Sequence, residues 1–113
     1  MLLLRFKPGT KTEVVDTQLL PGLLTLCYLM ETILGVSEIT ITSVNDGQHK
    51  LESLHYTGRA VDIRSKIYPP VKISRVVQEF KTLYDKDYDL IWESPGKPWE
   101  HLHLELDPGN TNH

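Results

Sequence analysis

The sequence is poor in the residues that mark several large classes of protein. It has a single cysteine, Cys27, which excludes an internal disulfide and a zinc site built from several thiolates. Its formal net charge is -3, and its 12 Lys and Arg side chains are scattered along the chain, so the charge pattern does not favour nucleic acid as a partner. Because Cys27 lies in an apolar run, we expect it to be a small buried hydrophobe.

Long apolar runs are also few. The N-terminal stretch MLLLRFKPGTK turns to charged residues after three leucines, which is too short for the apolar region of a signal peptide. We see no stretch of the length needed to span a membrane. We therefore expect one domain, 1–113, that has no cleaved leader and no membrane span and is a monomer.

The spacing of apolar residues predicts five strands and two helices. The strands are predicted at 2–6, 38–44, 60–64, 88–92 and 101–106, and the helices at 12–35, regular from about Pro21-Gly22, and at 71–84. A short last connection predicts an antiparallel hairpin. The fold class expected is α+β, a single domain with a mostly antiparallel sheet and two helices on one face, followed by a loose tail at 108–113.

The stretch HLHLE at 101–105 is unusual for a strand. Because side chains alternate between the two faces, His101, His103 and Glu105 share one face and the leucines between them share the other. The leucine face must lie toward the core. The opposite face then presents two imidazoles and a carboxylate, unless it is simply a solvated face rich in histidine.

A second polar group lies in SLHYTGRAVDI, at 53–63. Asp62 sits in the middle of a predicted strand, where aspartate is disfavoured. His55 precedes Gly58, and glycine allows the chain to bend so that His55 can fold back toward Asp62. The simpler interpretations are an exposed strand carboxylate and a loop histidine.

Taken together, the two stretches favour a metal site. His55, Asp62 and one histidine of the later strand supply two nitrogens and one oxygen, which with one open position is the pattern of a catalytic zinc site. Such a site also needs a carboxylate that moves a proton. Glu93 and Glu100 flank the predicted hairpin and could do so.

The segment SLHYTGRAVDI closely resembles the zinc-site segment of the Hedgehog signalling domain. DGQHK at 46–50, IWES at 91–94 and HLH at 101–103 are similar to further parts of that domain. The pattern SxHxxGxAxD followed by a later His also marks the zinc D-Ala-D-Ala carboxypeptidases and the phage endolysin peptidases of the same Hedgehog/D-Ala-D-Ala peptidase superfamily. The resemblance covers residues 38–107.

The resemblance implies a ligand set and a cofactor. His55, Asp62 and His103 would bind Zn²⁺. Ser53 matches the family serine two positions before the first ligand. His49 and His101 would orient the substrate or stabilise the transition-state oxyanion.

The resemblance leaves two candidates for the catalytic carboxylate. The Hedgehog register points to Glu93 in IWES, and the carboxypeptidase ExxH register points to Glu100 in EHLH. If the strand already runs regularly at Glu100, that side chain points to the leucine face. We therefore favour Glu93 and keep Glu100 as the alternative.

Two departures from the family pattern affect the expected substrate and ions. The carboxypeptidases carry an arginine before the first ligand to hold the substrate's terminal carboxylate, and ITSVNDGQHK at 41–50 has none. Lys50 or Arg59 could substitute, but the absence favours an endopeptidase. Only Asp46 matches the carboxylates of the Hedgehog calcium site, so we expect no calcium.

These observations predict a zinc metallopeptidase, a hydrolase that cuts peptides of bacterial cell-wall peptidoglycan as a D-Ala-type carboxypeptidase or an endopeptidase. A short chain without a leader suits an endolysin-like enzyme of a phage or prophage, cytoplasmic until its release to the cell wall, or virion-associated. The alternatives are a Hedgehog-like zinc-containing binding module and an α+β domain without metal. Because ligating histidines must be neutral, we expect metal occupancy and activity to fall below about pH 6.

Overall fold

The computed structural model describes residues 2–10, 15–45 and 58–106. Its elements are β1 (Leu3–Phe6), a short 3₁₀ helix η1 (Thr17–Leu19), α1 (Leu20–Leu34), β2 (Glu38–Asn45), β3 (Ala60–Arg64), α2 (Pro70–Leu83), β4 (Tyr88–Glu93) and β5 (His101–Leu106). This order confirms the predicted strands and helices, except that Val15 and Asp16, inside the first predicted helix, are not helical and precede η1. The predicted tail falls outside the described residues.

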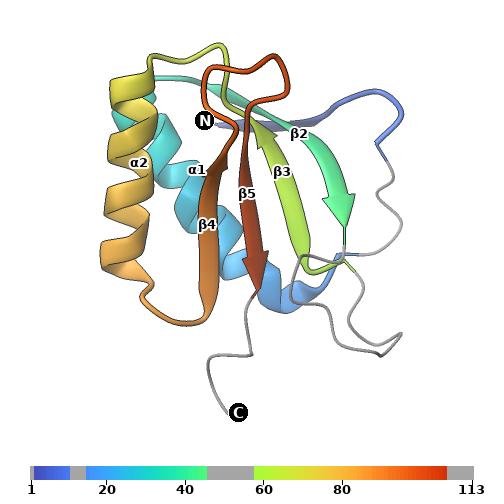
Figure 1. Ribbon diagram of the computed structural model, residues 1–113. Coiled ribbons are helices and arrows are strands. Elements are labelled where there is room, and N and C mark those ends of the chain that lie inside the picture. The colour runs from blue at the N-terminus through green and yellow to red at the C-terminus, as the bar shows by residue number, and fades with distance from the viewer. Residues whose placement is uncertain (1, 11–14, 46–57, 107–113) are drawn as a thin grey trace.

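The five strands form one mixed sheet in the order β1-β2-β3-β5-β4. β1 and β2 are parallel and are connected through α1, whereas the other three pairings are antiparallel (Figure 1). β4 and β5 form the antiparallel hairpin expected from their short connection. The fold is a compact α+β domain, as predicted, and most of its strand pairs are antiparallel.

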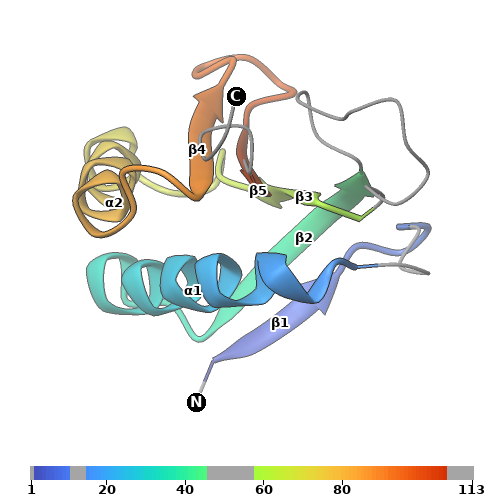
Figure 2. The same cartoon turned by 90° about the horizontal axis from the view of Figure 1, so that it is seen from below.

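Both helices cover the same face of the sheet, as Figure 2 shows. The hydrophobic core lies between them and this face. Strand residues that point inward include Val61, Ile63, Leu90, Leu102 and Leu104, all of which are buried. The predicted alternation of β3 and β5 is therefore confirmed, with leucines on the helix side and polar residues on the other.

The first helix packs closely against β4. A Cβ atom on Gly22 would lie 2.7 Å from ring carbons of Tyr88, so only glycine permits this approach. The Tyr88 hydroxyl donates a hydrogen bond to the Gln18 carbonyl oxygen at 2.6 Å. Cys27 is buried on this helix, as expected, and burial raises the pKa of its thiol to about 11.

The segment Thr17–Leu34 is, by length and composition alone, apolar enough to cross a membrane. The prediction that no stretch reaches this length was therefore wrong. The helices of soluble cores meet the same criterion, and here 39% of the segment is buried inside the fold. Its buried side chains, among them Leu19, Leu23, Leu26 and Met30, belong to the hydrophobic core.

Candidate metal centre

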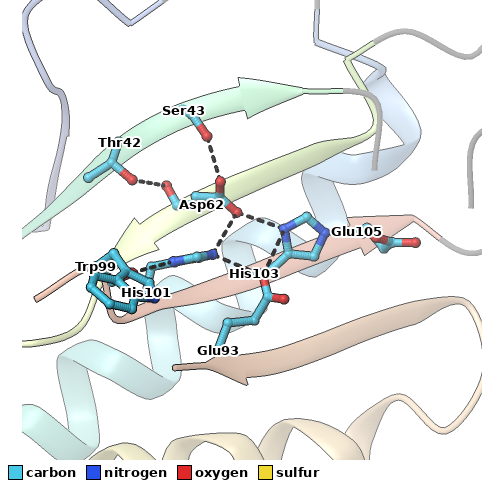
Figure 3. Close-up of polar contacts among 8 residues, drawn as sticks. All are labelled: Thr42, Ser43, Asp62, Glu93, Trp99, His101, His103 and Glu105. Carbon is cyan, nitrogen blue, oxygen red and sulfur yellow. Dashed lines mark hydrogen bonds and ion pairs between the residues drawn. The ribbon is translucent and has the colours of Figure 1, made fainter. Parts of the chain in front are cut away.

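The candidate site lies on the face of the sheet that the helices leave uncovered. Asp62 on β3 is opposite His103 on β5, and His101 is opposite Glu93 on β4. Residues opposite one another in antiparallel strands project to the same face. The strand register therefore brings these four side chains together, as Figure 3 shows.

The four side chains form two hydrogen-bonded pairs. His103 Nδ1 lies 2.7 Å from Asp62 Oδ1, and His101 Nε2 lies 2.9 Å from Glu93 Oε1. Across the pairs, His101 Nε2 is 3.6 Å from Asp62 Oδ1 and His103 Nδ1 is 3.9 Å from Glu93 Oε1. One donor atom from each residue thus lies within 4.8 Å of all the others.

This group could hold a metal ion. Two imidazole nitrogens and two carboxylate oxygens are a donor set that suits a divalent ion with mixed ligands. A tetrahedral ion with bonds of about 2.0 to 2.2 Å keeps its ligand atoms about 3.3 to 3.6 Å apart. For an ion to enter, the two short hydrogen-bonded contacts would have to lengthen by about 0.4 to 0.9 Å, and the separations longer than this range, of which the 3.9 Å between His103 and Glu93 is one, would have to shorten.

Asp62 is held as an oriented carboxylate. Ser43 Oγ on β2 donates to Asp62 Oδ2 at 2.6 Å, while Oδ1 faces His103. Burial raises the pKa of Asp62, but the hydrogen bonds from His103 and Ser43 outweigh it and hold the pKa below its ordinary value. The carboxyl is therefore ionised and suited to binding a cation.

Ser43 was not identified from the sequence. Its neighbours follow a plain alternating strand pattern, and the register of β2 against β3 shifts between Ile41 and Ser43. This irregularity places Ser43 opposite Asp62. Alternation within one strand carries no signal for such a shift.

His103 lies between two carboxylates. Its Nδ1 faces Asp62, and its Nε2 lies 2.7 Å from Glu105 Oε1. The hydrogen bond to Asp62 raises the pKa of His103, burial opposes this, and Glu105 raises it further, to about 9. Without an ion the ring is therefore protonated at neutral pH, and an ion at Nδ1 must displace that proton.

His101 has a different environment. Its Nδ1 lies 2.9 Å from the Trp99 carbonyl oxygen, which can only accept a hydrogen bond, so Nδ1 carries a proton. Its Nε2 faces Glu93, and that contact requires one further proton between the two groups. Glu93 and His101 therefore form a hydrogen-bonded pair beside the other two candidate ligands.

Glu100 lies apart from this group. Its carboxylate accepts hydrogen bonds from Ser65 Oγ at 2.8 Å, Trp92 Nε1 at 2.9 Å and the Gly96 backbone N–H at 3.0 Å. Desolvation raises the pKa of Glu100, but these hydrogen bonds, that of Gly96 first, hold it below its ordinary value. Glu100 precedes β5, which begins at His101, so strand parity does not apply to it, and it lines the cleft beside Asp62 and His101.

The remaining predicted site residues are His49, Ser53, His55 and Arg59. His49, Ser53 and His55 lie outside the described residues. Arg59 is described and buried, and its Nε lies 3.5 Å from Asp16 Oδ2, at the start of the helical segment. Arg59 therefore connects β3 to the chain before η1 instead of reaching the candidate metal ligands.

A cleft with a volume of about 540 Å³ lies beside Asp62 and His101. This size is in the range of small-molecule and peptide sites. Its lining includes three cationic side chains, Lys7, Arg64 and Lys66, the carboxylates of Asp62 and Glu100, and the apolar side chains of Ile67, Pro98 and Trp99. A ligand that carries both charged and apolar groups would suit this mixed lining.

Comparison with known protein families, curated protein sequences and solved structures finds no match. The description of the site therefore rests on the residues and geometry of this chain. It is an α+β domain that brings Asp62, Glu93, His101 and His103 together on the uncovered face of its sheet, where they could hold a metal ion.

Proposed function

We propose that the protein is a zinc-dependent metallopeptidase that hydrolyses peptides of bacterial peptidoglycan. The observation that carries this proposal is the meeting of two candidate ligands, Asp62 and His103, with the pair Glu93 and His101 at the edge of a cleft. The resemblance of SLHYTGRAVDI to zinc-site segments supports the same reaction. It also supplies His55 as the third ligand.

The donor set would hold zinc through Asp62 Oδ1 and His103 Nδ1, with His55 completing a site of three protein ligands. Zinc supplies Lewis-acid chemistry when bound, because it polarises a carbonyl and lowers the pKa of water. Ser43 keeps the Asp62 carboxylate turned toward His103. The ligand pair is therefore oriented before the ion arrives.

Glu93 would carry the proton. As the oxygen of the attacking water bonds to the carbonyl carbon, Glu93 takes the water's proton, and it returns this proton to the nitrogen when the C–N bond breaks. His101 is fixed by the Trp99 carbonyl at Nδ1, so its Nε2 can donate to the oxyanion. Both groups lie within 4 Å of a candidate ligand atom.

The cleft would receive the substrate. Lys7, Arg64 and Lys66 favour a peptide with free carboxylates, which cell-wall stem peptides have. Because Arg59 is turned away, these cations are the described candidates for holding such a group. We propose an endopeptidase before a carboxypeptidase, acting as a monomer released by a phage or prophage to the cell wall.

A second candidate function follows from the same four residues. If Asp62, Glu93, His101 and His103 all bind the ion, the site is closed, with no position for water. Such a zinc would be structural, and the protein would be a binding module like the signalling domain that the motif resembles.

Matched histidine variants separate the two functions. We would measure zinc content and cleavage of peptidoglycan peptides for His55→Ala, His101→Ala and Glu93→Gln, with His113→Ala from the predicted tail as the control. If the protein is the proposed peptidase, His55→Ala should lose zinc. His101→Ala and Glu93→Gln should keep zinc and lose cleavage. Loss of zinc in His101→Ala and its retention in His55→Ala would instead establish the closed site.

A further inference from the structure

Glu105 is a charged residue in an unexpected place. It lies on the same face of β5 as the two histidines, yet its exposed fraction is only 1%. In the register of the sheet it lies between Ala60 on β3 and Asp89 on β4. Carboxylates are rarely buried to this degree unless they have a specific partner. The structure gives Glu105 such a partner in His103.

The hydrogen bond to Glu105 determines how His103 can bind an ion. A carboxylate accepts, so the 2.7 Å contact places a proton on His103 Nε2. Nδ1 makes an equally short contact to Asp62 and is protonated in the ion-free protein, but it is the ring nitrogen that faces the other candidate ligands, so an ion would displace the proton there and leave the one on Nε2. A ligating histidine that donates its second N–H to a carboxylate is held in one tautomer and is a more basic ligand.

We propose that Glu105 is the positioning residue of the metal centre, holding His103 in the Nε2–H tautomer so that Nδ1 binds the ion beside Asp62. This role rests on the metal site of the proposed function and does not depend on peptidase activity. It also separates the two histidines. His101 is held by a backbone carbonyl, a weaker acceptor than the carboxylate behind His103, so His103 is the stronger ligand.

A purely structural role for Glu105 makes different predictions. If Glu105 only pairs with His103 inside the fold, its replacement would lower stability and leave the zinc affinity of the folded protein unchanged. If Glu105 positions His103, the affinity itself changes. Carboxylates that accept a hydrogen bond from a ligating histidine contribute about 10- to 100-fold to metal affinity.

The test measures zinc affinity by competition with a chromophoric chelator, alongside urea unfolding of the ion-free proteins. The variants are Glu105→Gln and Glu105→Asp, with Asp89→Asn as the control, since Asp89 lies opposite Glu105 on β4. We expect a 10- to 100-fold loss for Glu105→Gln, a smaller loss for Glu105→Asp and no change for Asp89→Asn. ¹⁵N NMR of the wild-type zinc form should show His103 protonated at Nε2 and bound through Nδ1.

Two results would overturn the inference. One is a folded Glu105→Gln variant whose affinity stays within about threefold of the wild type, well short of the change that such a partner contributes. The other is zinc bound through Nε2. If Glu105→Gln does not fold, the wild-type NMR spectrum still decides. A wild type that binds no zinc overturns the metal site as well, whereas one that binds zinc through Nδ1 without cleaving peptides contradicts the peptidase alone.

Discussion

The stability of the ion-free protein should fall as the pH rises from 6 to 9, because of His103. The folded protein raises the pKa of His103 to about 9, mainly through its hydrogen bond to Asp62, against 6.5 in the unfolded chain. The folded state therefore binds the proton more tightly. Its contribution is complete below pH 6.5 and is lost as the pH rises through about 9.

The magnitude follows from the two pKa values. Each pKa unit corresponds to 1.36 kcal/mol, so the difference between 6.5 and about 9 amounts to about 3 kcal/mol of unfolding free energy. The His103 side chain is only 5% exposed, so solvent screens the interaction little. The loss is a large part of the stability expected for a domain of this size.

Urea unfolding with a chelator present, at intervals from pH 6 to pH 9, would measure this effect. Titration of the Cys27 thiol lies above this range, because burial raises its pKa to about 11. His103→Gln is the reference, since it removes the imidazole and keeps a polar side chain. The wild type should lose about 3 kcal/mol relative to this variant, and parallel curves for the two proteins would refute the reasoning.

Three further predictions concern zinc binding and packing. Below pH 9 zinc must displace a proton from His103, so its apparent affinity should rise about tenfold per pH unit, which calorimetric titration at several pH values would measure. Glu100→Gln should leave zinc content unchanged but lower the free energy of unfolding by about 1 to 2 kcal/mol, because three hydrogen-bond donors lose a charged acceptor. Metal analysis and thermal unfolding of the same sample check the two parts. Gly22→Ala should destabilise the protein by about 1 to 3 kcal/mol, because the new Cβ atom meets the Tyr88 ring. An unfolding midpoint equal to that of the wild type would contradict this close packing of α1 on β4.

Local patterns predicted the elements of this fold but not their arrangement. The bounds of β3 and β5 agree with the prediction because apolar residues alternate strictly in both. The N-terminal helix is regular only from Leu20, where Pro21 fits its first turn. The strand order β1-β2-β3-β5-β4 depends on contacts between distant segments, which no pattern within one strand specifies.

The site shows the same division between local and distant information. Strand parity placed His101, His103 and Glu105 on one face, but it did not apply to Glu100, which precedes β5 and lines the cleft. Which carboxylate meets which histidine depends on the register between strands, and the register pairs Asp62 with His103. The expectation that zinc would be lost below about pH 6 used the ordinary imidazole pKa. The carboxylates around His103 raise that pKa, so the competition with protons begins near pH 9.

The two histidines of β5 differ because of what surrounds them and not because of their type. His103 is 5% exposed and lies between Asp62 and Glu105, which suits a ligand held in one orientation. His101 is 25% exposed, borders the cleft and is hydrogen-bonded to Glu93, which suits a group that meets substrate. An ion bound by Asp62 and His103 would leave Glu93 and His101 as the acid–base pair. The alternative closed site would require this second pair to break its own hydrogen bond as well, so the zinc affinity of the His101→Ala variant distinguishes the peptidase from the binding module.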